Sequence, residues 1–119
     1  MDQDQALAAF GALSQSTRFH MIRALVTAAP QGLSAGDVAE QTGASPSRAS
    51  FHLSTLADAG LVTSEKRART VIYRVSFDGL GALTAFLLHD CCRGNAQVRA
   101  CCEERQARAV ASNGEAPCC

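Results

Sequence analysis

The short segment Thr42-Gly43-Ala44, which lies between two helical patterns, constrains the fold more than any other part of this chain. Ser45-Pro46 follows it, and a hydroxyl residue before a proline is typical of a helix N-cap with proline at the first helical position. The helix that begins there ends at Gly60, because glycine is common just after a helix C-terminus. Ser34 caps a short preceding helix over residues 35–41. Helix, tight turn and helix in this order predict a helix-turn-helix motif.

Two further helices are expected before this motif. Leucine and phenylalanine recur at three-residue spacing over residues 3–13, which predicts an amphipathic helix that buries Leu7, Phe10 and Leu13. A second helix begins near Ser16 and stops at the proline-containing segment 29–32, and its expected buried residues are Phe19, Ile22, Leu25 and Val26. Within the motif, the positions expected to face inward are Val38, Ala39, Ala49, Leu53, Leu56 and Ala57.

After Gly60 the pattern changes from helical to extended. Residues 61–63 and 71–75 are rich in β-branched side chains, and the charged stretch 65–69 between them predicts a hairpin with a basic tip. Ser76 or Asp78 then caps a helix from Leu80 to about Asp90 that is apolar on several faces, which indicates packing against a partner chain. The fold class predicted is therefore mainly α with a β-hairpin, a dimeric winged helix-turn-helix.

Length and composition limit the class of protein. The chain has 119 residues, of which 47% are hydrophobic, and this is enough for one domain with a core that needs no disulfides. We expect this domain, with its C-terminal thiol segment, to cover residues 1–106, and residues 107–119 to form a flexible tail. The start of the chain is acidic and polar, and no apolar run reaches 18 residues, so we expect a cytoplasmic protein without a membrane partner.

The net charge of zero conceals a basic middle segment. Residues 45–75 hold five basic and two acidic side chains, which favours a nucleic-acid partner. On the second helix of the motif the positions left facing outward near the N-terminal end are Ser47, Arg48, Ser50, Phe51 and Ser54. Arg48 can donate to guanine O6 and N7, and Arg67 and Arg69 at the hairpin tip suit the phosphate backbone or a narrow minor groove.

Each of these residues also has an ordinary structural interpretation. Phe51 can belong to the core at a helix crossing, and Arg67 and Arg69 can form a merely solvated turn. His52 lies beside the packed face without a second histidine at metal-binding spacing, so we expect a structural role for it. The chain has no Cys-x-x-Cys motif and no histidine with an evident catalytic partner, so we expect no enzymatic activity.

All six cysteines follow Asp90, as three adjacent pairs: Cys91-Cys92, Cys101-Cys102 and Cys118-Cys119. In a reducing compartment such a group indicates metal or redox chemistry rather than a disulfide framework. Arg93 and Arg99 lie close by in the sequence, and we expect their charges to favour the thiolate form. Cys118 and Cys119, on the tail, either capture a ligand first or take no part.

Two stretches of the chain resemble one known family. Residues 12–23 are similar to the entry helix of ArsR/SmtB-type metalloregulatory repressors, and residues 45–56 with Ala59-Gly60-Leu61-Val62 are similar to their recognition helix and the start of their wing. The resemblance covers about residues 5 to 90. It implies a homodimeric winged-helix repressor, paired through its first and last helices, that leaves a palindromic operator DNA when it binds a metal or metalloid.

One departure from the family bears on the ligand site. Many arsenic and cadmium sensors of the family carry a Cys-Val-Cys element before the recognition helix, whereas this chain has Leu33-Ser34-Ala35-Gly36-Asp37-Val38 there. A related branch binds trivalent arsenic through C-terminal cysteines, and residues 90–95 resemble that element. The resemblance implies that arsenite or a trivalent organoarsenical is the inducer. Its ligands would be two or three thiolates drawn from Cys91, Cys92, Cys101 and Cys102.

Other ligands and another class of protein remain open at this point. Zinc sites space their cysteines two to four residues apart rather than adjacently. A zinc, cadmium or lead site would recruit further groups from His89, Asp90, Glu103 and Glu104. A thiol redox switch is a third possibility for the same fold. In a different class, the chain would be a thiol-based metalloid carrier or a small redox enzyme that binds no DNA, with helices that serve only as a scaffold.

Overall fold

The computed structural model describes the backbone of residues 1–113 and the side chains of residues 1–105, so Cys118 and Cys119 lie outside the described residues. The chain divides into two compact units, Met1–Leu83 and a second that begins at Thr84. Its elements are α1 (Gln3–Leu13), α2 (Ser16–Thr27), β1 (Leu33–Ser34), α3 (Ala35–Thr42), α4 (Pro46–Asp58), β2 (Val62–Arg67), β3 (Thr70–Val75), α5 (Phe77–Ala85), the π-helical segment η1 (Phe86–Cys91) and α6 (Ala96–Asn113).

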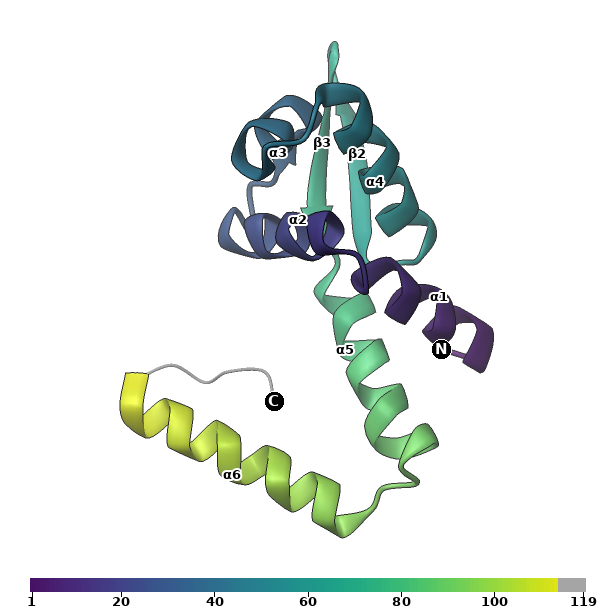
Figure 1. Cartoon of the computed structure of the whole chain (residues 1–119), viewed down its shortest axis with the longest axis vertical. Coiled ribbons are helices and arrows are strands. Elements are labelled where there is room, and N and C mark those ends of the chain that lie inside the picture. The colour runs from purple at the N-terminus through teal and green to yellow at the C-terminus, as the bar shows by residue number, and fades with distance from the viewer. Residues whose placement is uncertain (114–119) are drawn as a thin grey trace. The chain divides into compact units, whose positions relative to one another are not determined.

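The first unit is a winged helix-turn-helix, as predicted. Its antiparallel sheet has the order β1-β3-β2, and α2, α3 and α4 pack against it (Figure 1). The hairpin of β2 and β3 forms the wing. Strand β1 was not predicted, because a two-residue strand leaves no periodic pattern; it pairs with β3 through Leu33 and Tyr73. Strand β1 therefore joins the segment before α3 to the wing.

The helix-turn-helix motif has the local interactions that its sequence predicts. The Ser45 hydroxyl accepts a hydrogen bond from the backbone N–H of Arg48 at 3.3 Å, and Pro46 is the first helical residue of α4. Ser34 and Asp37 form a reciprocal capping box at the start of α3. Gly43 ends α3 with a φ of +75°, a left-handed conformation that favours glycine. Side chains next to the turn therefore fix its position in the chain.

The core of the first unit is small and aliphatic. Its largest fully buried side chains are Met21, Leu25, Val38, Leu53, Leu56 and Leu61. The inward positions predicted for α3 and α4 are confirmed at Val38, Ala39, Ala49, Leu53 and Leu56, while Ala57 is half-buried. These positions hold the motif's two helices together, since α3 and α4 pack closely on one another.

The predicted buried face of α1 is wrong. Ala6, Ala9 and Ala12 are buried, whereas Leu7 is 58% exposed and Phe10 is 37% exposed, and Leu13 is half-buried. Small side chains let α1 approach α2 and α4 closely, so the alanine face packs inward and the bulky face points away. The large residues recur with the same helical period as the alanines, and periodicity alone does not say which face is covered.

The prediction for α2 is also wrong in part. Ile22 and Leu25 are buried as expected and Met21 joins them, but Phe19 is 47% exposed and Val26 is 42% exposed. The polar Arg18 lies on the inward stripe with Ile22 and Leu25, because residues at i, i+4 and i+7 share one helix face. Two successive helices thus leave large apolar side chains uncovered within a single chain.

In the second half of the chain, the bounds of the strands and helices differ from those that the sequence predicts. Strands β2 and β3 pair up to Arg67 and Thr70, so Arg67 lies in a strand and only Ala68 and Arg69 form the turn. The helix after the wing begins at Phe77, and Ser76 caps it by accepting from the N–H of Gly79 at 3.0 Å. It passes into η1, and the unpredicted α6 runs to Asn113, beyond the domain boundary expected at residue 106. None of the described helices combines the length and apolar character needed to cross a membrane.

Gly79 in α5 provides a test of the packing between the start of α5 and the backbone at Gly60. A Cβ atom at position 79 would collide with the backbone carbonyl of Gly60. We expect Gly79→Ala to lower the free energy of unfolding by about 1–3 kcal/mol, the usual cost of overpacking. Gly81→Ala is the matched control, because a Cβ there has no neighbour within 4 Å. It should raise stability by roughly 0.5–1 kcal/mol through helix propensity. Chemical denaturation measures both, and equal effects would contradict the close contact.

Candidate nucleic-acid interface and cysteine segment

The outward face of α4 is polar and accessible, as predicted. Ser47, Arg48, Ser50 and Ser54 are exposed, whereas Ala49, Leu53 and Leu56 of the same helix are buried. Phe51 is 67% exposed, which rules out a core position for it within the single chain. Hydroxyl, guanidinium and aromatic groups therefore gather at the N-terminal half of one helix. A helix in the major groove reads bases with this half.

Two features of the α4 N-terminus support contact with an anion. The Ser45 and Ser47 hydroxyls lie 3.5 Å apart beside the first turn, and the N-terminus of a helix carries partial positive charge. Within the described part of the chain, Arg48 forms no ion pair, and neither do Lys66 and Arg69 on the wing. These three cations are available to phosphates or bases.

The carboxylate of Glu65 on the wing reduces the number of basic side chains available to DNA. Glu65 pairs with Arg74 at 2.7 Å and with Arg67 at 3.3 Å, and these two hydrogen-bonded guanidiniums lower the pKa of Glu65. Arg74 also donates from Nε to the carbonyl of Pro30 at 3.0 Å, so it ties the wing to the segment after α2. Charge counting alone missed this role of Glu65. Two of the five basic residues in segment 45–75 thus face an acidic partner.

His52 is a structural residue of α4, as expected. Its ring is buried, and Nδ1 lies 3.2 Å from Nη1 of Arg18 on α2. Burial lowers the pKa of His52, and the positive charges of Arg18 and Arg48 lower it further. Nothing in the sequence pattern linked Arg18 to His52, because the two residues are 34 positions apart.

The first cysteine pair lies where η1 ends. Cys91 is exposed and Cys92 is half-buried, and burial together with the hydrogen-bonded Cys91 thiol raises the pKa of Cys92. This contradicts the expectation that Arg93 and Arg99 favour the thiolate form at this residue. Arg93 adopts a positive φ of 54° in the turn, and neither arginine is among the groups that shift Cys92.

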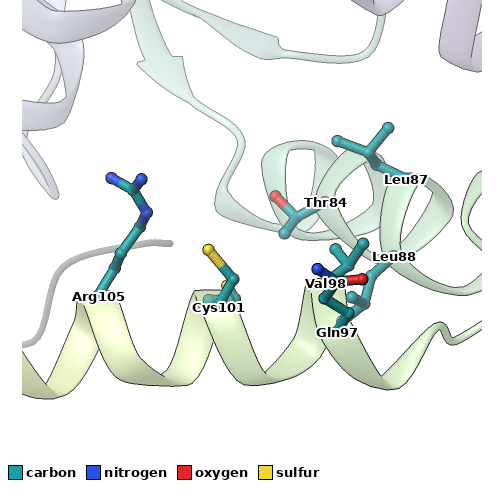
Figure 2. A pocket seen from close by; sticks show the side chains of 8 residues that line it. Thr84, Leu87, Leu88, Gln97, Val98, Cys101 and Arg105 are labelled. Carbon is teal, nitrogen blue, oxygen red and sulfur yellow. The ribbon is translucent and has the colours of Figure 1, made fainter.

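The second pair lines a pocket of about 470 Å³ within the second unit (Figure 2). Cys101 and Arg105 project from the same side of α6, and their hydrogen bond raises the pKa of Arg105. Arg105 was not predicted, although its position four residues after Cys101 places both on one helix face. The pocket is lined by Thr84, Leu87, Leu88, Gln97, Val98, Cys101, Cys102 and Arg105.

The predicted thiol ligands are not assembled into one group. Cys91, Cys92 and Cys101 are free thiols, and Cys102 takes part in a disulfide bond. Over the residues that the structure describes, no three His, Cys, Asp or Glu side chains lie together as metal ligands would. The assignment of Cys91, Cys92, Cys101 and Cys102 to one bound atom therefore stays a prediction, and it requires the segment to rearrange in its reduced form.

Known proteins are similar to this chain across the winged unit. A family profile described as a helix-turn-helix domain matches residues 13–65. The HTH-type transcriptional regulator YgaV of Escherichia coli (strain K12) is 33% identical over 89 residues, which are 75% of this chain and 88% of that relative. The match thus includes α4 and the wing together.

Two solved structures have the same fold. An ArsR-like transcriptional regulator from Rhodococcus sp. RHA1 has a TM-score of 0.67 and 25% identity, over 84% of this chain and 92% of that one. A structure described as a possible transcriptional regulator for arsenical resistance has a TM-score of 0.58 and 31% identity, over 65% of this chain and 77% of that one.

Glu65 leads to a prediction about the wing. We expect Glu65→Gln to raise the affinity for non-specific duplex DNA several-fold, because it removes an acidic group and frees Arg67 and Arg74. The slope of log affinity against log salt should steepen by about 1, the value for one added phosphate contact. Fluorescence anisotropy across a salt series measures this, with Asp4→Asn on α1 as a charge-matched control. A weaker complex would instead show that Glu65 holds Arg67 in its DNA-contacting position.

Proposed function

Since the chain belongs to the ArsR-like family of helix-turn-helix transcriptional regulators, we propose that it is a homodimeric repressor that releases its operator when trivalent arsenic binds its C-terminal thiols. The observation that carries the arsenic part is the apolar pocket whose wall includes Cys101 and Cys102. The DNA-binding part rests on the exposed face of α4 and on the free cations beside it.

DNA recognition follows from the chemistry of the α4 surface. Arg48 has a fork of donors that fits guanine O6 and N7, while Ser47 and Ser50 reach phosphates or base edges. Phe51 offers an apolar ring to a thymine methyl group. Lys66 and Arg69 on the wing add phosphate contacts, which position the protein but carry no sequence information.

Arg48 distinguishes a sequence-specific repressor from a carrier that binds no DNA. We expect Arg48→Ala to weaken operator binding by about 1–3 kcal/mol and to relax base preference at one position, because a bidentate guanine contact is lost. Arg23→Ala removes an equal charge from the exposed part of α2 and serves as the control. Anisotropy with operator and scrambled duplexes measures both variants. A repressor of this kind is excluded if Arg48→Ala binds the operator like the parent chain.

A homodimer accounts for the uncovered apolar residues of the first two helices. Leu7, Phe10, Phe19 and Val26 are all more than a third exposed, and a monomer in water has little reason to leave four such side chains uncovered. A second copy of the chain would cover them. Two recognition helices would then read half-sites about 34–36 Å apart, which fits a palindromic operator.

Soft thiolates select soft ions, which favours trivalent arsenic at the cysteine segment. Segment 33–38, where many relatives carry thiols, has none, so the ligands must lie elsewhere. Arsenite binds by exchange: each As–O bond is replaced by an As–S bond, and the thiol proton leaves with the hydroxide as water. No electrons are transferred to arsenic. Because Cys102 takes part in a disulfide, the responsive form is the chain with that bond reduced.

The lining of the pocket favours an arsenical that carries an organic substituent. Leu87, Leu88 and Val98 give it apolar walls, and a methyl or phenyl group on arsenic can occupy that space while sulfur takes the remaining arsenic bonds. Each buried CH₂ group contributes about 0.8 kcal/mol, so the substituent adds measurably to affinity. Arsenite itself would use only the thiols. We therefore propose that methylarsenite and phenylarsenite are stronger inducers than arsenite.

Titration of the reduced protein on its own promoter DNA tests the inducer. We expect stoichiometric arsenite, methylarsenite or phenylarsenite to weaken operator binding roughly 5–150-fold, the usual range of allosteric coupling. A variant with Cys91, Cys92, Cys101 and Cys102 all changed to serine should bind the operator normally and not respond. The Cys118→Ser, Cys119→Ser double variant is the matched control and should respond.

Three results would overturn the arsenic assignment. The first is release of the quadruple serine variant by arsenite, which would place the site elsewhere. The second is release of the parent chain by zinc, cadmium or lead but not by arsenicals. The third is release only by a disulfide-forming oxidant, which would make the cysteine segment a redox switch.

A further inference from the structure

The described part of the chain has one buried polar residue, and it lies on α4 itself. His52 is 6% exposed, and its Nδ1 lies 3.2 Å from Nη1 of Arg18. A guanidinium has donors but no acceptor, so Nδ1 must accept this hydrogen bond. The ring in this contact is therefore neutral and carries its proton on Nε2.

Arg18 joins three helices at one point. Its Nε donates to the carbonyl of Ala12 in α1 at 2.7 Å, and its backbone N–H donates to the side chain of Gln15, the N-cap of α2, at 2.8 Å. Its Nη1 reaches α4 through His52. Apolar packing resists separation of helices but has little directional preference, whereas these hydrogen bonds define both distance and orientation.

We propose that Arg18 and His52 are positioning residues for sequence-specific DNA binding. Their hydrogen bond sets where α4 presents its base-reading side chains. Protonation of His52 breaks it and so makes operator recognition sensitive to acid. This inference concerns the DNA-binding unit alone and does not depend on the arsenic response.

The charges around His52 determine the direction of the effect. Burial, Arg18 from α2 and Arg48 one turn earlier on α4 hold the pKa of His52 below its ordinary value of 6.5. Helix α1, α3 and β2 also pack on α4, but no described charged group on them shifts this residue. The neutral, bonded form therefore prevails at and above neutral pH, and it is lost as pH falls through the lowered pKa. Protonation then turns Nδ1 into a donor that faces another donor.

A matched pair of substitutions separates this role from simple packing. In His52→Asn the amide oxygen takes the place of Nδ1 as an acceptor and does not titrate. In His52→Leu the bulk remains but the acceptor is gone. Dissociation constants are measured for the protein's own promoter site and for a scrambled duplex, at about pH 7.5 and about pH 5.5 and constant ionic strength. The ratio of the two constants removes the general effect of charge, and circular dichroism confirms that each variant is folded.

We expect the operator preference of the parent chain to fall several-fold between the two pH values, because the lowered pKa leaves only part of the His52 population protonated at the lower pH. His52→Asn should keep its preference at both values, and His52→Leu should show the reduced preference at both. Should His52→Leu fail to fold, Arg18→Lys, which cannot reproduce the two separate guanidinium contacts, takes its place. The inference is overturned if the operator preference of the parent chain does not change with pH, or if His52→Asn loses as much preference in acid as the parent chain. It is also overturned if the folded His52→Leu or Arg18→Lys variant keeps the full operator preference. Absence of any operator preference would instead overturn the proposed function.

Discussion

Ala49, Leu53 and Leu56 of α4 are fully buried, and α4 packs on α1, α2, α3 and β2. This contact makes α4 both part of the core and the surface offered to DNA. Because a helix turns about 100° per residue, the residues on the far side of α4 from this buried stripe, such as Ser47, Phe51 and Ser54, point outward. The polar face of α4 is thus held by the same packing that stabilises the unit, and a base-reading surface needs that rigidity because hydrogen bonds to bases tolerate little displacement.

Most of the basic side chains on the strands of the wing are held by partners within the chain. These strands carry Lys66, Arg67 and Arg74, yet Glu65 engages two of the three and Arg74 is further held by the Pro30 carbonyl. The wing is therefore less positive than its arginine content indicates. Non-specific affinity depends on the number of phosphates neutralised, so a restrained wing leaves a larger share of the binding energy to contacts that read sequence.

The motif was predictable because its signals are local. Ser34, Gly43, Ser45 and Pro46 act within a few residues of themselves, and each has one dominant conformational preference. The covered faces of α1 and α2 were not predictable, since alanines and large residues recur with the same period and only the neighbouring helices decide between them. The contacts of Glu65 with Arg74 and of Arg18 with His52 join distant segments and leave no pattern. Helix α6, which follows a turn at Arg93, was not predicted either.

Under the proposed function, a signal from the cysteines has a covalent route to the DNA-binding unit through η1 and α5. The first turn of α5 rests on the end of α4: the approach of Gly79 to the Gly60 carbonyl leaves no room for a Cβ. A contact without free space transmits displacement, since packed groups shift together rather than compress. A coupling of about 1–3 kcal/mol is enough for a tens-fold change in operator affinity. A small displacement of α5 would then be enough to weaken operator binding, and α4 itself would not have to unfold for the DNA to be released.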